Sequence, residues 1–404
     1  MAADPKDKAK MTVVEGSYAI AHAVKTSRPH VISAYPITPQ THIVEEISQF
    51  IADGEIPNCE CINVESEFSA ISAVIGASAA GARAYSATTA QGLLLMHEAL
   101  FNVSGMRFPI VMTVINRAVS APINIWNDQQ DSISQRDTGW IQLYAEDTQE
   151  AADTILQAFK IAEDKEVLLP VMVCVDGFVL SHVYEPVVLM DQKEADAFLP
   201  PFKPDLYLDP KNPMSFGTLG DPSVYTEFRY LQEKAMEKAL DKIEQAANDF
   251  KKVTGRYHGG LIDSYQLEDA EIVIVTFGSI IGTIKDVVDA CRKKGEKIGI
   301  LKVRAFRPFP TKVINAALKN AKAIVVIEKD ISIGRNEGAL FTEIKSGLYN
   351  TDIRVPMIGY MVGHGGRDIR LKHIEEIIEE TKTVAKTGKI TVESRFNDVK
   401  EALL

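Results

Sequence analysis

Side chains able to do chemistry follow four apolar stretches in the first third of the chain. Threonines, carboxylates and an arginine occur there: Thr38 after VISAYPI, Glu65 and Glu67 after CINV, Thr88 and Thr89 after RAYSA, and Asn116 and Arg117 after PIVMTVI. A carboxylate in apolar surroundings has a raised pKa and can exchange a proton with a nitrogen heterocycle. A guanidinium can hold a small carboxylate through two parallel hydrogen bonds. Ligands of open parallel sheets bind beyond the carboxyl ends of the strands, so these residues are the candidates for a site.

Each candidate also has a purely structural interpretation. Thr38 precedes Pro39, which is a common helix start, and the residues alone favour a capping role for its hydroxyl. Glu67 could have only a structural role, in which its negative charge stabilises the N-terminus of the small-residue helix that follows it. Glu65 is an equal candidate for the functional carboxylate. Arg117 is either a surface arginine on a loop or a carboxylate clamp, and both interpretations stay open at this point.

Three further features give weaker signals. The polar run NDQQDS (127–132) could form a metal-binding or hydrogen-bonding loop, but such runs are more often solvated turns and its spacing fits no metal site. His42 and His97 lie in predicted helices without a partner ligand at useful spacing, so no metal site is predicted. GHGGRD (363–368) is too short and misplaced for a dinucleotide fingerprint.

The four cysteines give no cluster-binding run. Cys59 and Cys61 form CxC, whereas Cys174 and Cys291 stand apart in apolar surroundings. The sequence therefore predicts structural thiols in a reducing compartment, with no iron–sulfur cluster on this chain.

Length and composition limit the class of protein. The chain has 404 residues, 46% of them hydrophobic, and a formal net charge of −11 without a long basic run. These values favour a globular protein of two or three domains that does not bind nucleic acid. No signal peptide or apolar stretch of about 20 residues is found, which predicts a protein outside the membrane and located in the cytoplasm.

Alternating apolar strands and amphipathic helices predict an α/β fold with two parallel-sheet domains. The first spans 11–260 and includes a proline-rich loop and a long-helix arm from about 180, and the second spans 261–404. The predicted strands are 31–36, 61–66, 83–89, 109–117 and 168–177 in the first domain, and 271–279, 297–306, 323–330 and 355–363 in the second. The longest predicted helix is 227–255.

Several motifs together resemble one family. YPITP, ESEFSA, TTAQGLLLM, NRAVSAP with NDQQD, and FRPFP are similar to the alpha subunits of the pyruvate:ferredoxin oxidoreductases (pyruvate synthases) of the 2-oxoacid:ferredoxin oxidoreductase superfamily. The resemblance extends from about residue 11 to 385. It implies that the first domain is like the pyrimidine-binding domain of thiamine diphosphate enzymes and the second like the transketolase C-terminal domain.

The resemblance also implies roles for three residues. Thr38 and Arg117 would bind the 2-oxoacid, with the guanidinium of Arg117 on the carboxylate of the acid. Glu67 would bond N1′ of the thiamine aminopyrimidine and act in catalysis. Thr89, a candidate from the strand ends, is also predicted to contact the cofactor. Glu65 lies outside the matched position and takes second place.

What the chain lacks implies partners. Neither the family's GDG signature for diphosphate and Mg²⁺ nor its cluster-binding cysteines are found here. The resemblance therefore implies a shared thiamine diphosphate, with Mg²⁺ and [4Fe-4S] clusters on beta, gamma and delta subunits, and pyruvate, coenzyme A and ferredoxin as reactants. Alternatives are the same chemistry on 2-oxoisovalerate, 2-oxoglutarate or oxalate, and a non-catalytic scaffold subunit. A nucleotide-binding dehydrogenase lacks its glycine fingerprint.

Overall fold

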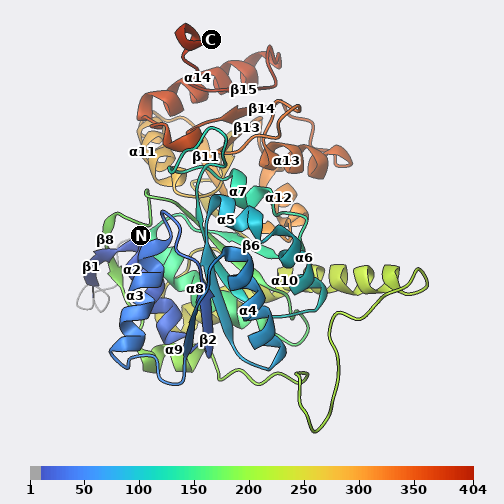
Figure 1. Cartoon of the computed structure of the whole chain (residues 1–404). Helices are drawn as coiled ribbons and strands as arrows, with labels where there is room; N and C mark the ends of the chain where they lie inside the picture. The colour runs from blue at the N-terminus through green and yellow to red at the C-terminus, as the bar shows by residue number, and fades with distance from the viewer. Residues whose placement is uncertain (1–10) are drawn as a thin grey trace.

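The computed structural model describes residues 11–404, which form two α/β units stacked end to end (Figure 1). The first contains a seven-stranded sheet in the order β12-β6-β7-β5-β4-β2-β3, in which every pair is parallel except β12–β6. Its strands are β2 (Val31–Ala34), β3 (Glu60–Asn63), β4 (Ala84–Thr88), β5 (Val111–Asn116), β6 (Ile141–Tyr144), β7 (Val171–Asp176) and β12 (Ala305–Arg307). The predicted parallel sheet is thereby confirmed.

Helices cover both faces of this sheet because its strands are apolar on both sides. In β5, Val111 and Ile115 pack into one hydrophobic core, and Met112 and Val114 pack into the other. The first core is closed by α2 (Gly16–Thr26), α3 (Thr41–Ala52), α8 (Thr148–Ala162) and α10 (Tyr225–Thr254), and the second by α4 (Glu67–Ala79), α5 (Ala90–Leu95) and α6 (His97–Gly105).

The second unit is built around a six-stranded sheet in the order β15-β14-β13-β10-β11-β9, in which only β11–β9 is antiparallel. One face of this sheet packs with the second core of the first unit, so the two units share buried apolar residues. Its elements are β9 (Ile262–Tyr265), β10 (Ile272–Thr276), α11 (Ile280–Lys293), β11 (Ile298–Val303), α12 (Thr311–Leu318), β13 (Ala323–Glu328), α13 (Ala339–Tyr349), β14 (Met357–Met361), the 3₁₀ turns η1 (His364–Gly366) and η2 (Glu401–Leu403), α14 (Leu371–Thr387) and β15 (Ser394–Phe396).

The predicted single strand 297–306 is wrong. It is divided at Arg304, which is fully buried and donates to Glu150 of α8 at 3.1 Å. The residues before Arg304 form β11 in the second sheet, and those after it form β12, which pairs with β6 at the edge of the first sheet. The chain therefore returns to the first unit after entering the second.

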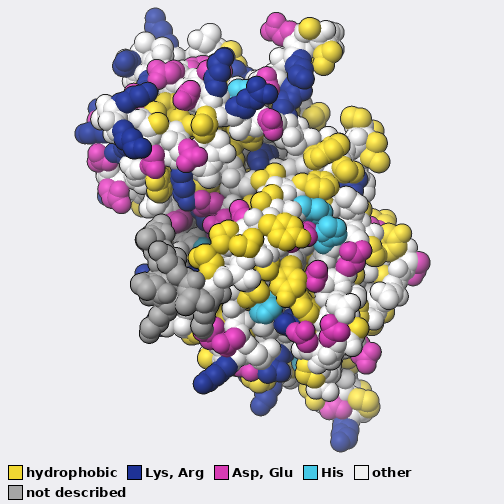
Figure 2. Space-filling model, turned by 90° about the vertical axis from the view of Figure 1, so that its left-hand side faces the viewer, with side chains coloured by type: hydrophobic (Ala, Val, Ile, Leu, Met, Phe, Trp, Pro, Cys, Tyr) yellow, Lys and Arg dark blue, Asp and Glu magenta, His cyan; other side chains and the backbone are white. Residues whose placement is uncertain are grey.

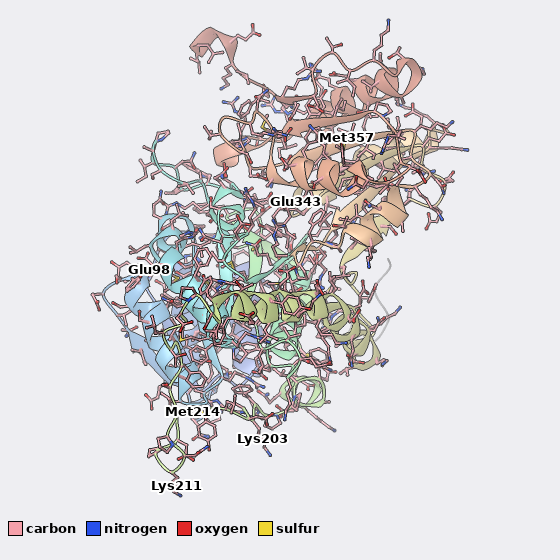
Figure 3. All side chains as sticks on the ribbon, turned by 90° about the vertical axis from the view of Figure 1, so that its right-hand side faces the viewer. Glu98, Lys203, Lys211, Met214, Glu343 and Met357 are labelled. Atoms are coloured by element: carbon pink, nitrogen blue, oxygen red, sulfur yellow. The ribbon has the colours of Figure 1, made fainter. Side chains whose placement is uncertain are left out.

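The region predicted to contain the arm holds more structure than expected. A two-stranded sheet of β1 (Met11–Glu15) and β8 (Tyr184–Val188), and the helix α9 (Gln192–Phe198), were not predicted. The proline-rich loop has no helix or strand between 200 and 222, as predicted. Figure 3 shows this loop hanging from the first unit, with Lys203, Lys211 and Met214 along it.

The long predicted helix is confirmed as α10. Its second half is buried through Ala239, Ile243 and Phe250, whereas its first turns carry the exposed side chains Phe228 and Leu231 and project from the molecule (Figure 1). Within residues 11–404, no helix is both long enough and apolar enough to cross a membrane.

Candidate functional site

The two candidate carboxylates differ in burial. Glu67 is the first residue of α4, after Ser66, whose hydroxyl caps the helix by accepting from the backbone N–H of Ser69 at 3.2 Å. The side chain of Glu67 points inward and is only 7% exposed. Glu65 lies on the surface, where the Ser69 hydroxyl donates to it and thereby lowers its pKa. The buried carboxylate suited to a site is therefore Glu67.

Glu67 is seated against a glycine of α5. A Cβ atom on Gly92 would lie 2.6 Å from Glu67 Oε1 and 2.6 Å from Thr88 Oγ1, so a larger residue would displace the carboxylate. Thr88 Oγ1 and both amide atoms of Gln91 are buried without a hydrogen-bond partner among residues 11–404. Beside Glu67 the Thr88 hydroxyl is thus a buried polar group without a partner, which calls for an explanation.

Thr89, the sequence-predicted cofactor contact, is fully buried and its hydroxyl donates to the carbonyl of Ile115 on the neighbouring strand β5. The hydroxyl proton of Thr89 is therefore used in a hydrogen bond to the neighbouring strand. The hydroxyl without a partner is that of Thr88, one residue earlier, which the sequence pattern marks equally but does not distinguish.

Arg117 is buried, which excludes the interpretation as a surface arginine. Its Nε donates to the Asn124 carbonyl at 3.0 Å and its Nη1 to the Thr38 carbonyl at 2.8 Å. Burial lowers the pKa of Arg117, and the nearby charge of Asp131 partly opposes this. Nη2 forms no hydrogen bond within the described chain, so the guanidinium is held in place while its Nη2 donors remain free.

Thr38 is not a helix cap, and the prediction from the residues alone was wrong. A turn in which the backbone N–H of Gln40 donates to the Ile37 carbonyl at 2.8 Å comes first, and α3 begins only at Thr41. Thr38 is exposed, with its carbonyl bonded to Arg117. The structure thus brings these two predicted site residues into direct contact, at the ends of β2 and β5.

Asp131 organises the same strand ends. Its fully buried carboxylate accepts from the backbone N–H groups of Ala90 and Arg117, both at 3.0 Å, and from Asn116 Nδ2 at 2.7 Å. Burial raises the pKa of Asp131 to about 7, and these donors oppose the rise. Asp131 therefore ties the backbone after Thr89 to the backbone of Arg117, a role that the sequence did not reveal.

The NDQQDS segment is not the solvated turn that the sequence favoured. Asn127, Gln129 and Asp131 are all at most 2% exposed. Asn127 Oδ1 accepts from Lys329 Nζ at 2.9 Å, and Gln129 Nε2 donates to Asp176 at 2.9 Å. The segment is buried because residues of both units supply its polar partners, Asp176 from the first and Lys329 from the second.

A buried ion pair joins the two units at this edge. Lys329 Nζ lies 2.8 Å from Asp176 Oδ2, and the same carboxylate accepts from the Ser279 backbone N–H at 2.9 Å. Burial acts to raise the pKa of Asp176, but the charge of Lys329 and the donated hydrogen bonds hold it below its ordinary value. The GHGGRD turn adds a further contact, because the Gly366 N–H donates to the Asn127 carbonyl at 2.7 Å.

Replacing Gly92 by alanine is expected to displace the Glu67 carboxylate and to lower strongly any activity that depends on it, with little change in thermal stability. The added methyl group would overlap Glu67 Oε1 and Thr88 Oγ1, which are side-chain atoms able to move. The matched control is Gly76→Ala in α4, where nothing lies within 4 Å of the new Cβ. Equal activity of the two variants would contradict this account of the Glu67 seat.

Comparison with solved structures shows the general class of fold to which the chain belongs. The chain resembles a solved 2-oxoglutarate:ferredoxin oxidoreductase from Magnetococcus marinus with a TM-score of 0.72 and 18% identity, over 94% of this chain and 66% of that one. It also resembles a split-gene transketolase, with a TM-score of 0.54 and 10% identity, over 93% of this chain and 100% of that one. These likenesses establish a two-domain α/β fold of the kind found in 2-oxoacid oxidoreductases and transketolases.

The family follows from closer relatives. A family model described as pyruvate flavodoxin/ferredoxin oxidoreductase, thiamine diphosphate-binding, matches residues 22–248, and one described as pyruvate:ferredoxin oxidoreductase core domain II matches 270–374. The chain is 69% identical to pyruvate synthase subunit PorA of Methanosarcina barkeri over 401 residues, which are 99% of this chain and 100% of the relative. The chain belongs to the pyruvate:ferredoxin oxidoreductase family.

Two other relatives bear on specificity. Pyruvate synthase subunit PorA of Methanothermobacter thermautotrophicus is 49% identical over 92% of this chain and 95% of its own. A ketoisovalerate oxidoreductase subunit VorA of Pyrococcus horikoshii is 47% identical over 96% of this chain and 98% of its own. At this distance, relatives named for two different oxoacids are nearly equally similar to the chain.

The residues at the sheet edge fit one side of the cofactor that the family model names. A buried carboxylate and a neighbouring hydroxyl without a partner can satisfy the ring nitrogen and amino group of an aminopyrimidine. They offer nothing for a diphosphate and its metal ion, and the sequence contains no GDG. Glu67 and Thr88 are therefore suited to the pyrimidine end alone.

Proposed function

We propose that this chain is the alpha subunit of a pyruvate:ferredoxin oxidoreductase and supplies the pyrimidine side and the substrate side of a shared active site. The complex converts pyruvate and coenzyme A to acetyl-CoA and CO₂ with electrons to ferredoxin, or runs in reverse as pyruvate synthase. The observation that carries the proposal is the buried Glu67, with the unpaired Thr88 hydroxyl beside it, within the segment matched by the thiamine diphosphate-binding model.

Thiamine diphosphate, when bound, supplies a carbon nucleophile for the oxo group and an electron sink for the pair released with CO₂. Glu67 holds and returns a proton at N1′ of its aminopyrimidine, a task that favours a carboxylate shielded from water. The Thr88 hydroxyl, beside Glu67, satisfies a neighbouring polar atom of the ring. Thr89 contributes by fixing the end of β4, since its hydroxyl is bonded to Ile115.

Arg117 and Thr38 act on the substrate. The free Nη2 edge of Arg117 binds the carboxylate of the 2-oxoacid, and its other donors are used to hold the loop 117–127 and the Thr38 carbonyl. Thr38, which is exposed and follows the nearby strand β2, donates its hydroxyl to the substrate. Asp131 is a positioning residue, because it fixes the backbone of Arg117.

A partner subunit covers this edge and completes the site. The exposed hydrophobic side chains at the strand ends and on the loops beside them are Tyr35, Phe68, Leu95, Ile123, Trp126 and Val179. Figure 2 shows hydrophobic side chains gathered on one face of the first unit. Exposed apolar surface of this kind favours a protein interface.

The composition of the complex follows from what this chain does not supply. We expect a beta subunit with the diphosphate and Mg²⁺ site, and gamma and delta subunits that, with the beta subunit, carry the [4Fe-4S] clusters. A cytoplasmic location belongs to the same proposal.

Pyruvate is the preferred substrate, in line with the 69% identical relative, which is named for pyruvate. The assembled complex should therefore oxidise pyruvate faster than 2-oxoisovalerate, 2-oxoglutarate or oxalate. Steady-state rates with each acid, at equal coenzyme A and ferredoxin, test this. A higher kcat/KM for 2-oxoisovalerate would group the chain with the ketoisovalerate oxidoreductases instead.

Arg117→Ala is expected to raise the KM for pyruvate by about 10- to 100-fold, because charged hydrogen bonds of about 1.5–3 kcal/mol are lost. The dissociation constant of thiamine diphosphate should stay within about twofold, since Arg117 is assigned to the substrate end. The control is Arg354→Ala, an exposed arginine of the second unit that also bonds backbone carbonyls. An unchanged KM in Arg117→Ala, with cofactor binding lost instead, would reverse the assignment.

A further inference from the structure

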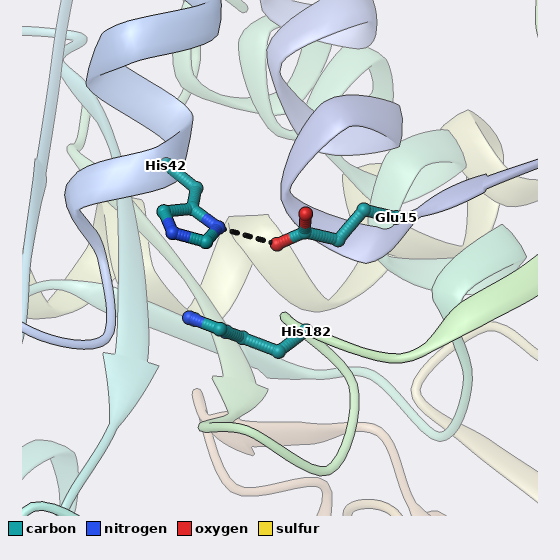
Figure 4. A group of neighbouring side chains, drawn as sticks. All are labelled: Glu15, His42 and His182. Atoms are coloured by element: carbon teal, nitrogen blue, oxygen red, sulfur yellow. Dashed lines mark hydrogen bonds and ion pairs between the residues drawn. The ribbon is translucent and has the colours of Figure 1, made fainter.

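Three side chains from separate parts of the first unit form a cluster that the proposed reaction does not use. Glu15 ends β1, His42 is the second residue of α3, and His182 lies in the loop between β7 and β8. His42 has no partner ligand at useful spacing in the sequence, but folding brings the three side chains together (Figure 4). One oxygen or nitrogen from each lies within 4.8 Å of the others.

The two histidines offer different ring nitrogens to a cation. The Ser181 hydroxyl lies 2.8 Å from His182 Nδ1, and Ser181 Oγ also accepts from the Phe178 backbone N–H at 2.9 Å. A histidine whose Nδ1 is held in this way presents the lone pair of Nε2, which is a usual arrangement of metal-binding histidines. On His42 the nitrogen beside the carboxylate is Nδ1, which lies 2.7 Å from Glu15 Oε1, so a cation bound by both residues takes the place of the proton between them.

Aromatic contacts orient the two rings. The ring centroids of His42 and His182 lie 4.5 Å apart, and the ring centroid of Phe178 lies 4.7 Å from that of His182. Burial, together with the neighbouring His42, lowers the pKa of His182. The cluster is partly open to solvent, since the side chain of His42 is 45% exposed.

We propose that Glu15, His42 and His182 bind a divalent cation of the zinc class. Two imidazoles and one carboxylate are a donor set that zinc accepts, with the remaining position open to water. This donor set is unlike the all-oxygen site that Mg²⁺ prefers, so the cation is distinct from the one that accompanies the cofactor.

The bound ion would fasten the substrate end of the site. Glu15, His42 and His182 belong to three segments, and the loop that carries His182 begins at Gly177, which packs against Pro39, the residue after Thr38. A cation at the cluster therefore joins β1 and the start of α3 to this loop. Its effect should be on stability and on the position of Thr38, because no ligand of the cluster belongs to the proposed reaction.

The test is titration of the full-length chain, stripped with EDTA, with Zn²⁺ by calorimetry. We expect one equivalent that raises the melting temperature, and in His42→Ala and in His182→Ala a loss of affinity of at least about 100-fold, since even outer-shell partners are worth 10- to 100-fold. Co²⁺ in place of Zn²⁺ should give visible d–d absorption in the wild type that is lost in both variants.

The controls address other zinc ligands and loss of folding. His373→Gln, on the distant helix α14, should leave the titration unchanged. The double variant Cys59→Ser with Cys61→Ser should also leave it unchanged, because burial raises the pKa of the Cys59 thiol to about 12. Melting temperatures in EDTA should agree among all variants, which shows that lost binding is not lost folding. No binding by the wild type, or binding lost in the cysteine variant and kept in the histidine variants, would overturn the proposal.

Discussion

Glu67→Gln is expected to lower the turnover of the assembled complex by about 10²- to 10⁴-fold, the usual contribution of a general acid or base. Glutamine has the same shape and fits the same seat beside Gly92, but it cannot take and return a proton. The melting temperature of the chain should therefore change little. The measurement is pyruvate-dependent reduction of ferredoxin with saturating coenzyme A and thiamine diphosphate.

The chain provides a matched control two residues away. Glu65→Gln makes the same chemical change on the exposed carboxylate, and it should leave turnover within about twofold, as surface substitutions generally do. If Glu67→Gln were as active as Glu65→Gln, the chain would be a scaffold that organises the complex without entering its chemistry.

Lys329→Met is expected to destabilise the chain by about 3–5 kcal/mol, because it leaves the carboxylate of Asp176 buried without its counter-ion. The pKa of Asp176 is depressed, so the contribution of the ion pair is complete above the ordinary pKa of an aspartate and fades only as the pH falls below it. Urea unfolding at pH 7 therefore measures the full contribution of the ion pair to the free energy of unfolding.

The double variant Asp176→Asn with Lys329→Met separates the charge from the packing. Removing both charges should recover much of the lost stability, since the penalty comes from the unpaired ion. Lys322→Met, which breaks an exposed pair with Glu271, should cost no more than about 1 kcal/mol. A loss in Lys329→Met no larger than this would show that the ion pair does not hold the two units together.

Local patterns were sufficient to predict most of the fold. Strands such as β5 and β7 read as apolar runs because both faces are covered, and α10 showed helical spacing over its whole length. The prediction failed where the partner is distant in sequence. Arg304 divides a continuous apolar run because Glu150, on α8, lies beneath it, and β12 pairs with β6 for a reason that no local pattern contains.

The site was predictable to the same extent. The strand ends pointed to Thr38, Glu67, Thr89 and Arg117, whose roles stay predictions until the variants are measured. Burial, which sequence alternation could not provide, separates Glu67 from Glu65.

Contacts across the chain account for what the sequence missed at this edge. The Asn127–Asp131 segment looks hydrophilic in isolation, and it is buried because its polar partners are distant in sequence, as with Asn127 and Lys329, some 200 residues later. Asp131 was missed for the same reason, because the backbone groups that it binds are 41 and 14 residues away.

The return of the chain to the first sheet has a consequence for biosynthesis. Until residue 307 has left the ribosome, β6 has no β12 beside it, and the first sheet carries an open edge of unpaired backbone groups. Such an edge can pair with another nascent chain. A fragment ending near residue 260 would keep that edge permanently, so expression of the first unit alone should favour aggregates over a folded domain.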